Sequence, residues 1–174
     1  MDGMDGSSNA HVVVYVVVYL MRGSDVLLIR RRPDARVVPD RFMGVGGHLE
    51  LGEDPFIGAA RECREESGLT PLDLRLRGTL VWTENIHHKH AGLLYVFTAT
   101  IFEGKLLEES DEGALHWMPI AALDTLEAFV GRDRRCIPHL LRDPTAHVVE
   151  IEQREGEGSR IINSNAYFAE RARR

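Results

Sequence analysis

The sequence has few cysteines and no long uninterrupted apolar run. Its 174 residues include only two cysteines, Cys63 and Cys136, which are too few for a disulfide framework and too far apart in sequence for a paired metal site. The longest apolar run, residues 12–21, is about half the length that a helix needs to cross a bilayer. No basic segment precedes this run, so we expect no signal peptide, no membrane partner and a cytoplasmic protein.

The sequence also lacks an excess of positive charge. Its formal net charge is -6, and no block of lysine and arginine is long enough to suggest a groove for nucleic acid. A protein that binds duplex DNA or RNA through the phosphate backbone is expected to carry the opposite sign. Small polyphosphates are compatible with this charge, because a metal ion or a few arginines can overcome a modest global repulsion.

The length predicts one domain, with a polar, Gly/Ser-rich and disordered tail at residues 1–9 and a single folded domain at residues 10–174. Strands interleaved with two helices and no internal repeat predict a sandwich of the α/β or α+β fold class, of which we favour α/β. A hairpin is expected at residues 146–153 and 160–168. The other predicted elements are strands at 11–20, 25–32, 42–45, 74–82, 93–102 and 114–118 and helices at 55–67 and 126–141.

The clearest helix lies between two strong boundary signals. Asp54 is a suitable N-cap, Pro55 fits the first helical position, and Gly68 stands where a left-handed residue would end the helix. The first strand, dense in Val and Tyr, is expected to be buried on both faces. The helix is expected to pack on this core through a stripe formed by Phe56, Ala60, Cys63 and Ser67.

Three glutamates crowd the end of this helix. Glu62, Glu65 and Glu66 are spaced i, i+3 and i+4, so they lie within an arc of about 100°, away from the predicted core stripe, and repel one another. The helix dipole disfavours anions there, and Arg61 and Arg64 are expected to offset only part of the repulsion. A solvated acidic face is the simplest alternative. A bound divalent cation would relieve the cluster, and oxygen ligands suit Mg²⁺, with Mn²⁺ as a substitute.

The segment before the helix favours the metal-binding interpretation. Residues 46–53 form a glycine-rich loop, in which the backbone can approach a ligand closely. Together with the helix, this loop resembles the Nudix family, whose box reads G-x5-E-x7-R-E-U-x-E-E-x-G-U with U an aliphatic residue. Every fixed position matches, and Cys63 is a mild departure at an apolar position. The matching residues are Gly47, Glu53, Arg61, Glu62, Cys63, Glu65, Glu66, Gly68 and Leu69.

The resemblance implies a fold and a set of metal ligands. The fold is a Nudix-type α/β/α sandwich with a mixed central sheet, to which the predicted C-terminal hairpin is added. Glu62 and Glu66 would bind the metal directly, Glu65 would be a further ligand or the general base, and the carbonyl of Gly46 would be another ligand.

The resemblance also implies structural support for the loop. Glu53 would pair with Arg61 and hold the loop against the helix. Gly47 and Gly68 would support the same arrangement without taking part in the chemistry.

A fourth acid lies outside the box. Glu112 stands five residues before Trp117, in an acidic stretch that could simply be a surface turn. This arrangement resembles the 8-oxo-dGTP diphosphatases of the MutT type, where a glutamate at that position reaches the metal site. Glu112 is therefore a candidate second ligand or general base, and the choice of base among Glu112, Glu65 and Glu62 stays open.

The resemblance to the MutT type also suggests residues that contact the substrate. Arg31, and beside it Arg30, could contact phosphate, although a solvated strand end explains them equally well. Met43 stands where some members use an asparagine to read the oxidised purine, and it cannot hydrogen-bond the base in that way. Asp133 is a candidate for the base pocket. A loop with His87, His88 and His90 is expected to be solvated or to face the substrate, rather than to bind a transition metal.

The expected function is Mg²⁺-dependent hydrolysis of a nucleoside triphosphate to the monophosphate and pyrophosphate, with 8-oxo-dGTP as a candidate. Other Nudix substrates, namely ADP-ribose, diadenosine polyphosphate or capped RNA, form the alternative. The ADP-ribose branch typically has a proline where this chain has Glu84 and Asn85. A catalytically silent nucleotide sensor is a third reading, which the intact set of glutamates disfavours. The expected partner is a small nucleotide, and the protein is expected to be a monomer or homodimer.

Overall fold

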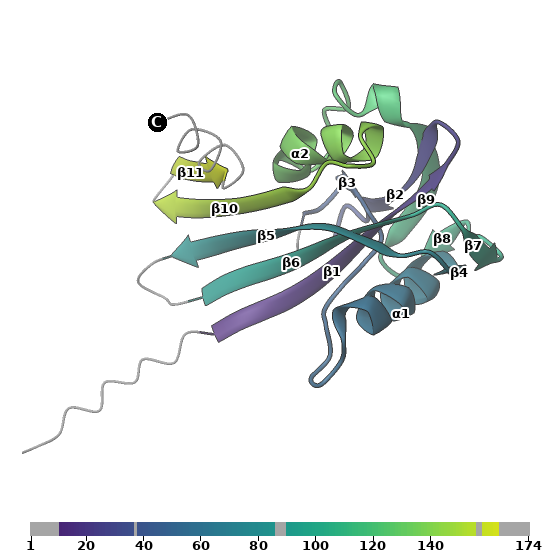
Figure 1. Cartoon of the computed structure of the whole chain (residues 1–174), viewed down its shortest axis with the longest axis horizontal. Helices are drawn as coiled ribbons and strands as arrows, with labels where there is room; N and C mark the ends of the chain where they lie inside the picture. The colour runs from purple at the N-terminus through teal and green to yellow at the C-terminus, as the bar shows by residue number, and fades with distance from the viewer. Residues whose placement is uncertain (1–10, 37, 86–89, 156–157, 164–174) are drawn as a thin grey trace, which may run out of the picture.

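The protein is a sheet with one helix on each face in the part of the chain that the structure describes (Figure 1). This computed structural model describes the backbone outside residues 1–10, 37, 86–89, 156–157 and 164–174, and side chains outside residues 1–11, 37, 83–90, 131–135 and 149–174. The predicted tail at residues 1–9 lies outside the described part of the chain. None of the described helices is long and apolar enough to span a membrane.

The sheet is mixed and runs in the order β11-β10-β5-β6-β1-β2-β9-β8, with β3 paired to β2, while β4 and β7 form a separate pair. The α/β fold class is confirmed, and so is the C-terminal hairpin, in which β10 pairs antiparallel with β11. The helices are α1 (Pro55–Ser67), the 3₁₀ helix η1 (Ile120–Ala122) and α2 (Gly131–Arg142). The strands are β1 (His11–Arg22), β2 (Asp25–Arg31), β3 (Phe42–Met43), β4 (Leu69–Pro71), β5 (Arg75–Asn85), β6 (His90–Ala99), β7 (Phe102–Gly104), β8 (Glu109–Ser110), β9 (Gly113–Pro119), β10 (Val148–Glu155) and β11 (Gly158–Asn163).

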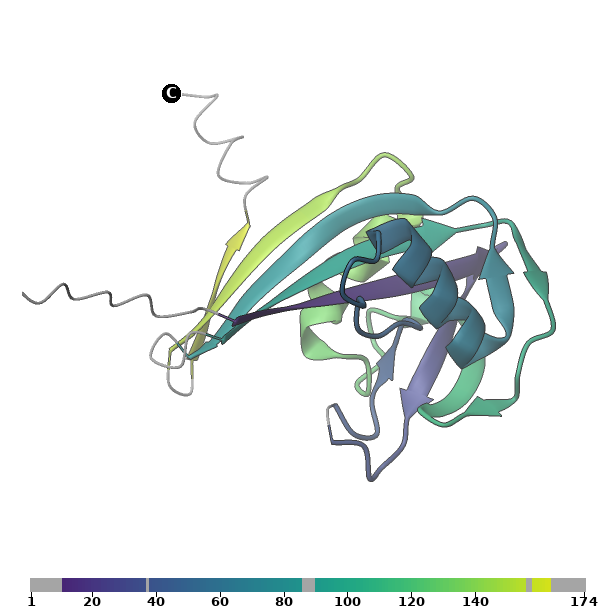
Figure 2. The ribbon, with the colours of Figure 1, turned by 90° about the horizontal axis from the view of Figure 1, so that it is seen from below.

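Strand β1 separates two hydrophobic cores. Because successive side chains of a strand point to opposite faces, Val16 and Val18 pack on the side of α1, while Val17 and Tyr19 pack on the side of α2. Figure 2 shows α1 in front of the sheet and α2 behind it. This double coverage explains the apolar run from Val16 to Leu20, but the prediction was wrong for Val12 and Val13, which are 55% and 39% exposed.

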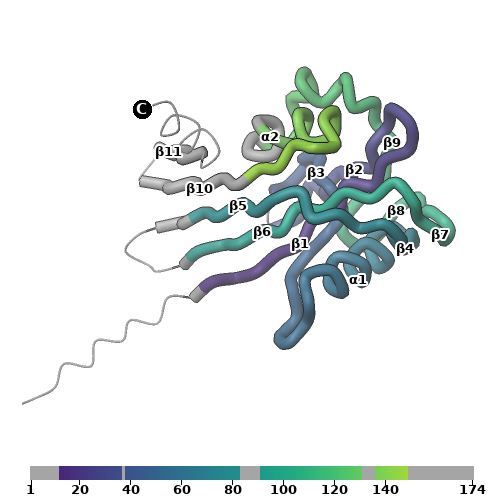
Figure 3. Tube along the Cα trace, viewed as in Figure 1, coloured from purple at the N-terminus to yellow at the C-terminus, as the bar shows by residue number. Residues whose placement is uncertain are grey.

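Strands β1 and β2 stay paired only at their hairpin. Their register joins Met21 to Val26 and Arg22 to Asp25, after which the two strands diverge. On its other edge, β1 pairs in parallel with β6 from His11 to Leu20. The trace in Figure 3 shows β1 and β6 side by side along this length. One edge of β1 is therefore left open for another segment of the chain.

Helix α1 has the predicted ends, but its buried face is rotated. Asp54 accepts a hydrogen bond from the backbone N–H of Phe56, and Gly68 ends the helix with a left-handed φ of 74°. Phe56 is 45% exposed, whereas Ala59 is fully buried. The predicted stripe through Phe56 and Ala60 was therefore wrong at these two positions. The buried residues of α1 are Gly58, Ala59, Cys63, Glu66 and Ser67.

Helix α2 begins five residues later than predicted. Residues 126–130 instead lie beside β3, where Phe42 donates a backbone hydrogen bond to Ala128 and accepts one from Val130. Phe129 is 1% exposed in this segment. Because the backbone groups of the segment bond to a strand, they are not available for helical hydrogen bonds.

Three short strands were not predicted, namely β4, β7 and β8. Each has only two or three residues, which is too short for the period-two pattern to be recognised. The predicted strand at 93–102 covers residues 93–99 of β6 and only the first residue of β7, with a break at residues 100 and 101. The second strand of the hairpin was predicted to reach residue 168, and residues 164–168 lie outside the described part of the chain.

A buried arginine joins α2 to the sheet. Arg77 lies at a register shift in β5, is 5% exposed, and has a pKa lowered by burial. Its guanidinium nitrogen Nη2 donates to the carbonyl oxygens of Leu140, Asp143 and Ala146 at 2.9, 2.6 and 3.0 Å. The carbonyl of Leu140, in the last turn of α2, lacks an intrahelical donor, so Arg77 satisfies an acceptor that burial would otherwise leave unpaired, whereas the carbonyl of Asp143 also accepts from the backbone N–H of Ala146.

We predict that Arg77→Met lowers the free energy of unfolding by about 3 kcal/mol, because it leaves buried carbonyls without a donor. Urea denaturation followed by circular dichroism measures this change. Arg75→Met, at an exposed position of the same strand, is the control and should change stability by less than about 0.5 kcal/mol. Equal stabilities of the two variants would contradict the role of Arg77.

Candidate active site

The glycine-rich loop occupies the open edge of β1. Val18 donates a backbone hydrogen bond to Val45 at 2.7 Å, and Val16 donates one to Gly47 at 2.9 Å. Leu49 in turn donates to the carbonyl of Val14. The loop is thus fixed along the central strand, and α1 follows it directly.

Glu66 connects the helix to this loop. The backbone N–H of Gly46 donates to Oε2 of Glu66 at 2.6 Å, and Glu66 is only 7% exposed. Burial raises the pKa of Glu66 to about 8; the Gly46 amide opposes this rise, while the charges of Glu62 and Glu112 add to it. Among the described residues, no arginine or lysine forms an ion pair with Glu66. The expectation that all three helix glutamates lie away from the core was wrong for this residue.

Glu62 lies directly against the loop backbone. A Cβ atom at Gly47 would be 2.5 Å from Oε2 of Glu62, so any larger residue there would displace the carboxylate from this position. The side chain of Glu62 is 14% exposed, and its Oε1 accepts a hydrogen bond from Arg61 at 2.8 Å. Gly47 and Glu62 therefore fit each other closely.

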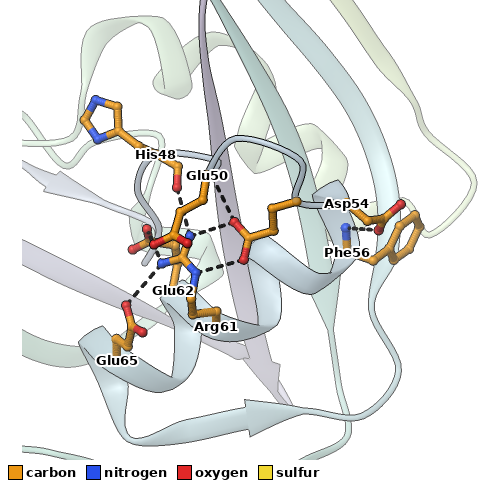
Figure 4. Close-up of polar contacts among 8 residues, drawn as sticks. His48, Glu50, Asp54, Phe56, Arg61, Glu62 and Glu65 are labelled. Atoms are coloured by element: carbon orange, nitrogen blue, oxygen red, sulfur yellow. Dashed lines mark hydrogen bonds and ion pairs between the residues drawn. The ribbon is translucent and has the colours of Figure 1, made fainter.

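Arg61 holds several acids together (Figure 4). Its guanidinium donates twice to Glu53 at 2.9 Å, once to Glu65 at 3.1 Å and once to the carbonyl of His48 at 3.0 Å, besides its bond to Glu62. The hydrogen bonds from Arg61 lower the pKa of Glu53 to about 2. The same bonds to Glu53 and Glu62 raise the pKa of Arg61. Arg61 therefore contacts two of the three clustered glutamates, Glu62 and Glu65, in addition to its predicted partner Glu53.

Glu112 approaches the cluster from another part of the chain. The antiparallel register of β2 and β9 places Arg31 opposite Gly113, next to Glu112. Arg31 forms an ion pair with the carboxylate of Glu112, and the backbone N–H of Arg32 donates to its carbonyl at 3.1 Å. Because Glu112 and Arg31 both affect the pKa of Glu66, the three groups lie within electrostatic reach of one another.

The two candidate arginines lie on opposite faces of β2. Ile29 belongs to the core beside α1, so Arg31 points to that side by strand alternation, whereas Arg30 points to the side of α2. Arg30 pairs with Asp40 at 2.9 Å and lies 5.7 Å from the ring of Phe42. The structure therefore brings Arg31, but not Arg30, to the glutamates.

The remaining candidates are placed as follows. Met43 pairs with Ile29 and packs, half-buried, on the core beside α1. Glu65 has a 53% exposed side chain and contacts Arg61. Asp133 lies in α2, but its side chain is outside the described residues, as are His87, His88 and the side chain of His90. In the described part of the chain, no three His, Cys, Asp or Glu side chains converge as they stand on a point that could hold a metal ion.

An aromatic group beside the loop was missed by the sequence analysis. The ring of Tyr15 lies 4.5 Å from that of His48 and 5.5 Å from that of Trp82, between centroids. Period-two alternation in β1 already places Tyr15 on the face of Val17. Its pairing with His48 needs the bridge between β1 and the loop, which the sequence does not reveal.

Solved structures of similar fold were found. The MutT protein of Bacillus halodurans superposes with a TM-score of 0.74 and 22% identity, over 86% of this chain and 97% of that chain. A Nudix hydrolase from Nitrosomonas europaea gives a TM-score of 0.64 at 21% identity, over 79% and 93% of the two chains. At this identity the likeness concerns the fold, and it confirms the predicted α/β/α sandwich.

Curated relatives share part of the chain. An uncharacterized Nudix hydrolase of Bacillus subtilis is 30% identical over 49% of this chain and 55% of its own length. The NAD-capped RNA hydrolase of Pseudomonas aeruginosa is 31% identical over 65% and 38%, and the human diphosphoinositol polyphosphate phosphohydrolase 3-beta is 35% identical over 52% and 49%. The chain thus spans about half, or less, of the length of these relatives. Residues 9–140 match the family model described as the NUDIX domain, and this protein belongs to the Nudix family.

Proposed function

We propose that this protein hydrolyses a nucleoside triphosphate to the nucleoside monophosphate and pyrophosphate, by attack of water on phosphorus with the help of Mg²⁺. The observation that carries the proposal is the buried carboxylate of Glu66, which lies within electrostatic reach of Glu62, Glu112 and Arg31 but forms no ion pair with a cationic side chain among the described residues. The charged form of a buried carboxylate beside two other acids is unfavourable without a cation.

The residues fit a hard divalent cation. Glu62, Glu66 and Glu112 offer carboxylate oxygens, which Mg²⁺ and Mn²⁺ prefer, and the Gly46 carbonyl is proposed as a further ligand. When bound, the cation supplies charge neutralisation between the anionic cluster and the substrate and stabilises charge on the leaving pyrophosphate. Arg61 holds Glu62 in place, and the Gly46 amide holds Glu66.

The side chains of this protein would bind and orient the substrate. Arg31 can donate two parallel hydrogen bonds to phosphate oxygens on the side of the sheet where the acids lie. The attacking water must lose a proton, and Glu62, Glu65 or Glu112 accepts it at a carboxylate oxygen. The aromatic group of Tyr15, His48 and Trp82 offers ring faces for stacking with a nucleobase.

The preference for a triphosphate rests on likeness to the MutT type. The named relatives, in contrast, act on NAD-capped RNA and on diphosphoinositol polyphosphate, both of which also contain a pyrophosphate bond. The deciding experiment is an assay with Mg²⁺ on dGTP, 8-oxo-dGTP, pyrimidine triphosphates, ADP-ribose, dinucleoside polyphosphates and NAD-capped RNA. The proposal is supported if a triphosphate gives the highest kcat/KM and releases pyrophosphate, and a preference for ADP-ribose, a dinucleoside polyphosphate or the capped RNA would replace it.

Glu66→Gln should abolish most of the turnover, because the amide cannot carry the charge that balances the cation. We expect kcat to fall by more than the roughly 10- to 100-fold loss that is typical of residues behind the metal ligands. Steady-state kinetics on the best substrate of the panel measures the loss. Glu103→Gln, at an exposed position of β7, is the matched control. Near-normal activity of Glu66→Gln would refute the assignment of Glu66 as a ligand.

The metal-free protein should become less stable as the pH rises from about 4.5 to about 8, because folded Glu66 keeps its proton over this range while the unfolded chain has lost it. The stabilising contribution of protonated Glu66 is fully present below the unfolded pKa of about 4.5, and it is lost as the pH rises through the folded pKa of about 8. The slope of unfolding free energy against pH should be steeper than that of Glu66→Gln by up to about 1.4 kcal/mol per pH unit.

Urea denaturation in the presence of a chelator tests this pH dependence, and the comparison with Glu66→Gln cancels the contribution of all other groups. Saturating Mg²⁺ should reduce the difference in slope, since the cation favours the deprotonated carboxylate. Parallel pH profiles of the two proteins without metal would show that Glu66 titrates normally in the folded state.

A further inference from the structure

The end of β2 holds Glu112 by both its side chain and its backbone. Nη1 of Arg31 donates to the carboxylate of Glu112, and the backbone N–H of Arg32 donates to the carbonyl of Glu112 at 3.1 Å. Ser110 contributes a weaker contact to the backbone N–H of Glu112, at 3.3 Å. The fourth acid is therefore engaged by a cation of the protein itself, and this engagement crosses 81 positions of sequence.

The two partners of this ion pair differ in how far they are buried and in whether their hydrogen-bonding groups are all paired. The side chain of Arg31 is 17% exposed, whereas that of Glu112 is 46% exposed. Nε of Arg31 is buried and has no hydrogen-bond partner in the described part of the chain. A buried donor without an acceptor is unfavourable, and a phosphate group could supply the missing acceptor together with a second oxygen for the same guanidinium.

We propose that Arg31 is a positioning residue that holds Glu112 away from the metal ion until a phosphate group of the substrate takes over the guanidinium. The proposal rests on the proposed function. In the nucleotide-free protein, Arg31 neutralises Glu112. When phosphate oxygens accept hydrogen bonds from Arg31, the carboxylate of Glu112 is released and joins Glu62 and Glu66 as a ligand of the cation.

The energetics make this exchange feasible. Because Arg31 is largely buried, breaking the pair would be unfavourable if its guanidinium were left without an anion, and the phosphate group supplies the replacement. Glu112 exchanges one cationic partner for another, and Arg31 exchanges one anionic partner for another, so neither charge is left unpaired. Such an exchange couples the binding of phosphate to that of the cation, and the coupling is reciprocal.

A binding experiment without substrate isolates this effect. We measure the affinity of Mn²⁺ for the nucleotide-free full chain by electron paramagnetic resonance, comparing the natural protein with Arg31→Met, Glu112→Gln and the double variant. Arg31→Met should bind Mn²⁺ about tenfold more tightly, within the usual range of coupling between two sites. In the Glu112→Gln background, the same change should have an effect below about twofold. Arg30→Met, on the other face of β2, is the matched control and should leave the affinity unchanged.

The double variant separates the proposal from simple electrostatics. Removal of a positive charge near acids would tighten Mn²⁺ binding equally in both backgrounds, and that result, or no gain in Arg31→Met, overturns the proposal. If Arg31→Met does not give the circular dichroism spectrum of the natural protein, Arg31→Gln carries the same comparison. Failure of the proposed function looks different: the natural protein would then show no Mn²⁺ binding that Glu66→Gln removes.

Discussion

The burial of Glu66 is the constraint on which the site depends. Helix α1 packs on the sheet through Ala59 and Cys63, and the same rotation of the helix carries Glu66 to the edge of the core. The only hydrogen bond that Glu66 receives from the described residues comes from the Gly46 amide, so the folded protein holds an acid whose charged form is disfavoured. Such a local conflict is expected at a functional site, where the surrounding structure maintains a group that does not stabilise the fold.

Two arginines bind the other acids of the site in different ways. Arg61 is a fixed element, because it bonds to Glu53, Glu62 and Glu65 and to the loop backbone at once, and no single substitute could satisfy all of these groups. Arg31 makes one ion pair and keeps an unsatisfied donor. The first arrangement suits a scaffold that must keep its geometry during turnover, and the second suits a contact that can be exchanged.

The sequence predicted those features that depend on neighbouring residues. The caps of α1 and the burial of β1 on both faces from Val16 to Leu20 follow from patterns of a few consecutive positions. The rotation of α1 was misjudged, because Ala59 and Ala60 are equally compatible with a core face and tertiary packing decides between them. The start of α2 was misjudged for a similar reason, since the bonds between Phe42 and residues 128–130 join segments far apart in sequence. The ion pair of Arg31 with Glu112 needed the register of β2 on β9, which no local pattern contains.

The same distinction explains why the chemistry of this protein is easier to infer than its substrate. The proposed metal ligands and their support lie mostly within residues 46–68, on one loop and one helix, so their spacing carries information in the sequence itself. The groups that could contact a nucleobase come from β1, the loop and β5, and they meet only because β1 pairs with the loop on one edge and, through β6, neighbours β5 on the other. Tyr15, His48 and Trp82 can therefore vary separately while the acid cluster keeps its geometry. A fold arranged in this way can retain one reaction at a pyrophosphate bond while the molecule attached to that bond changes.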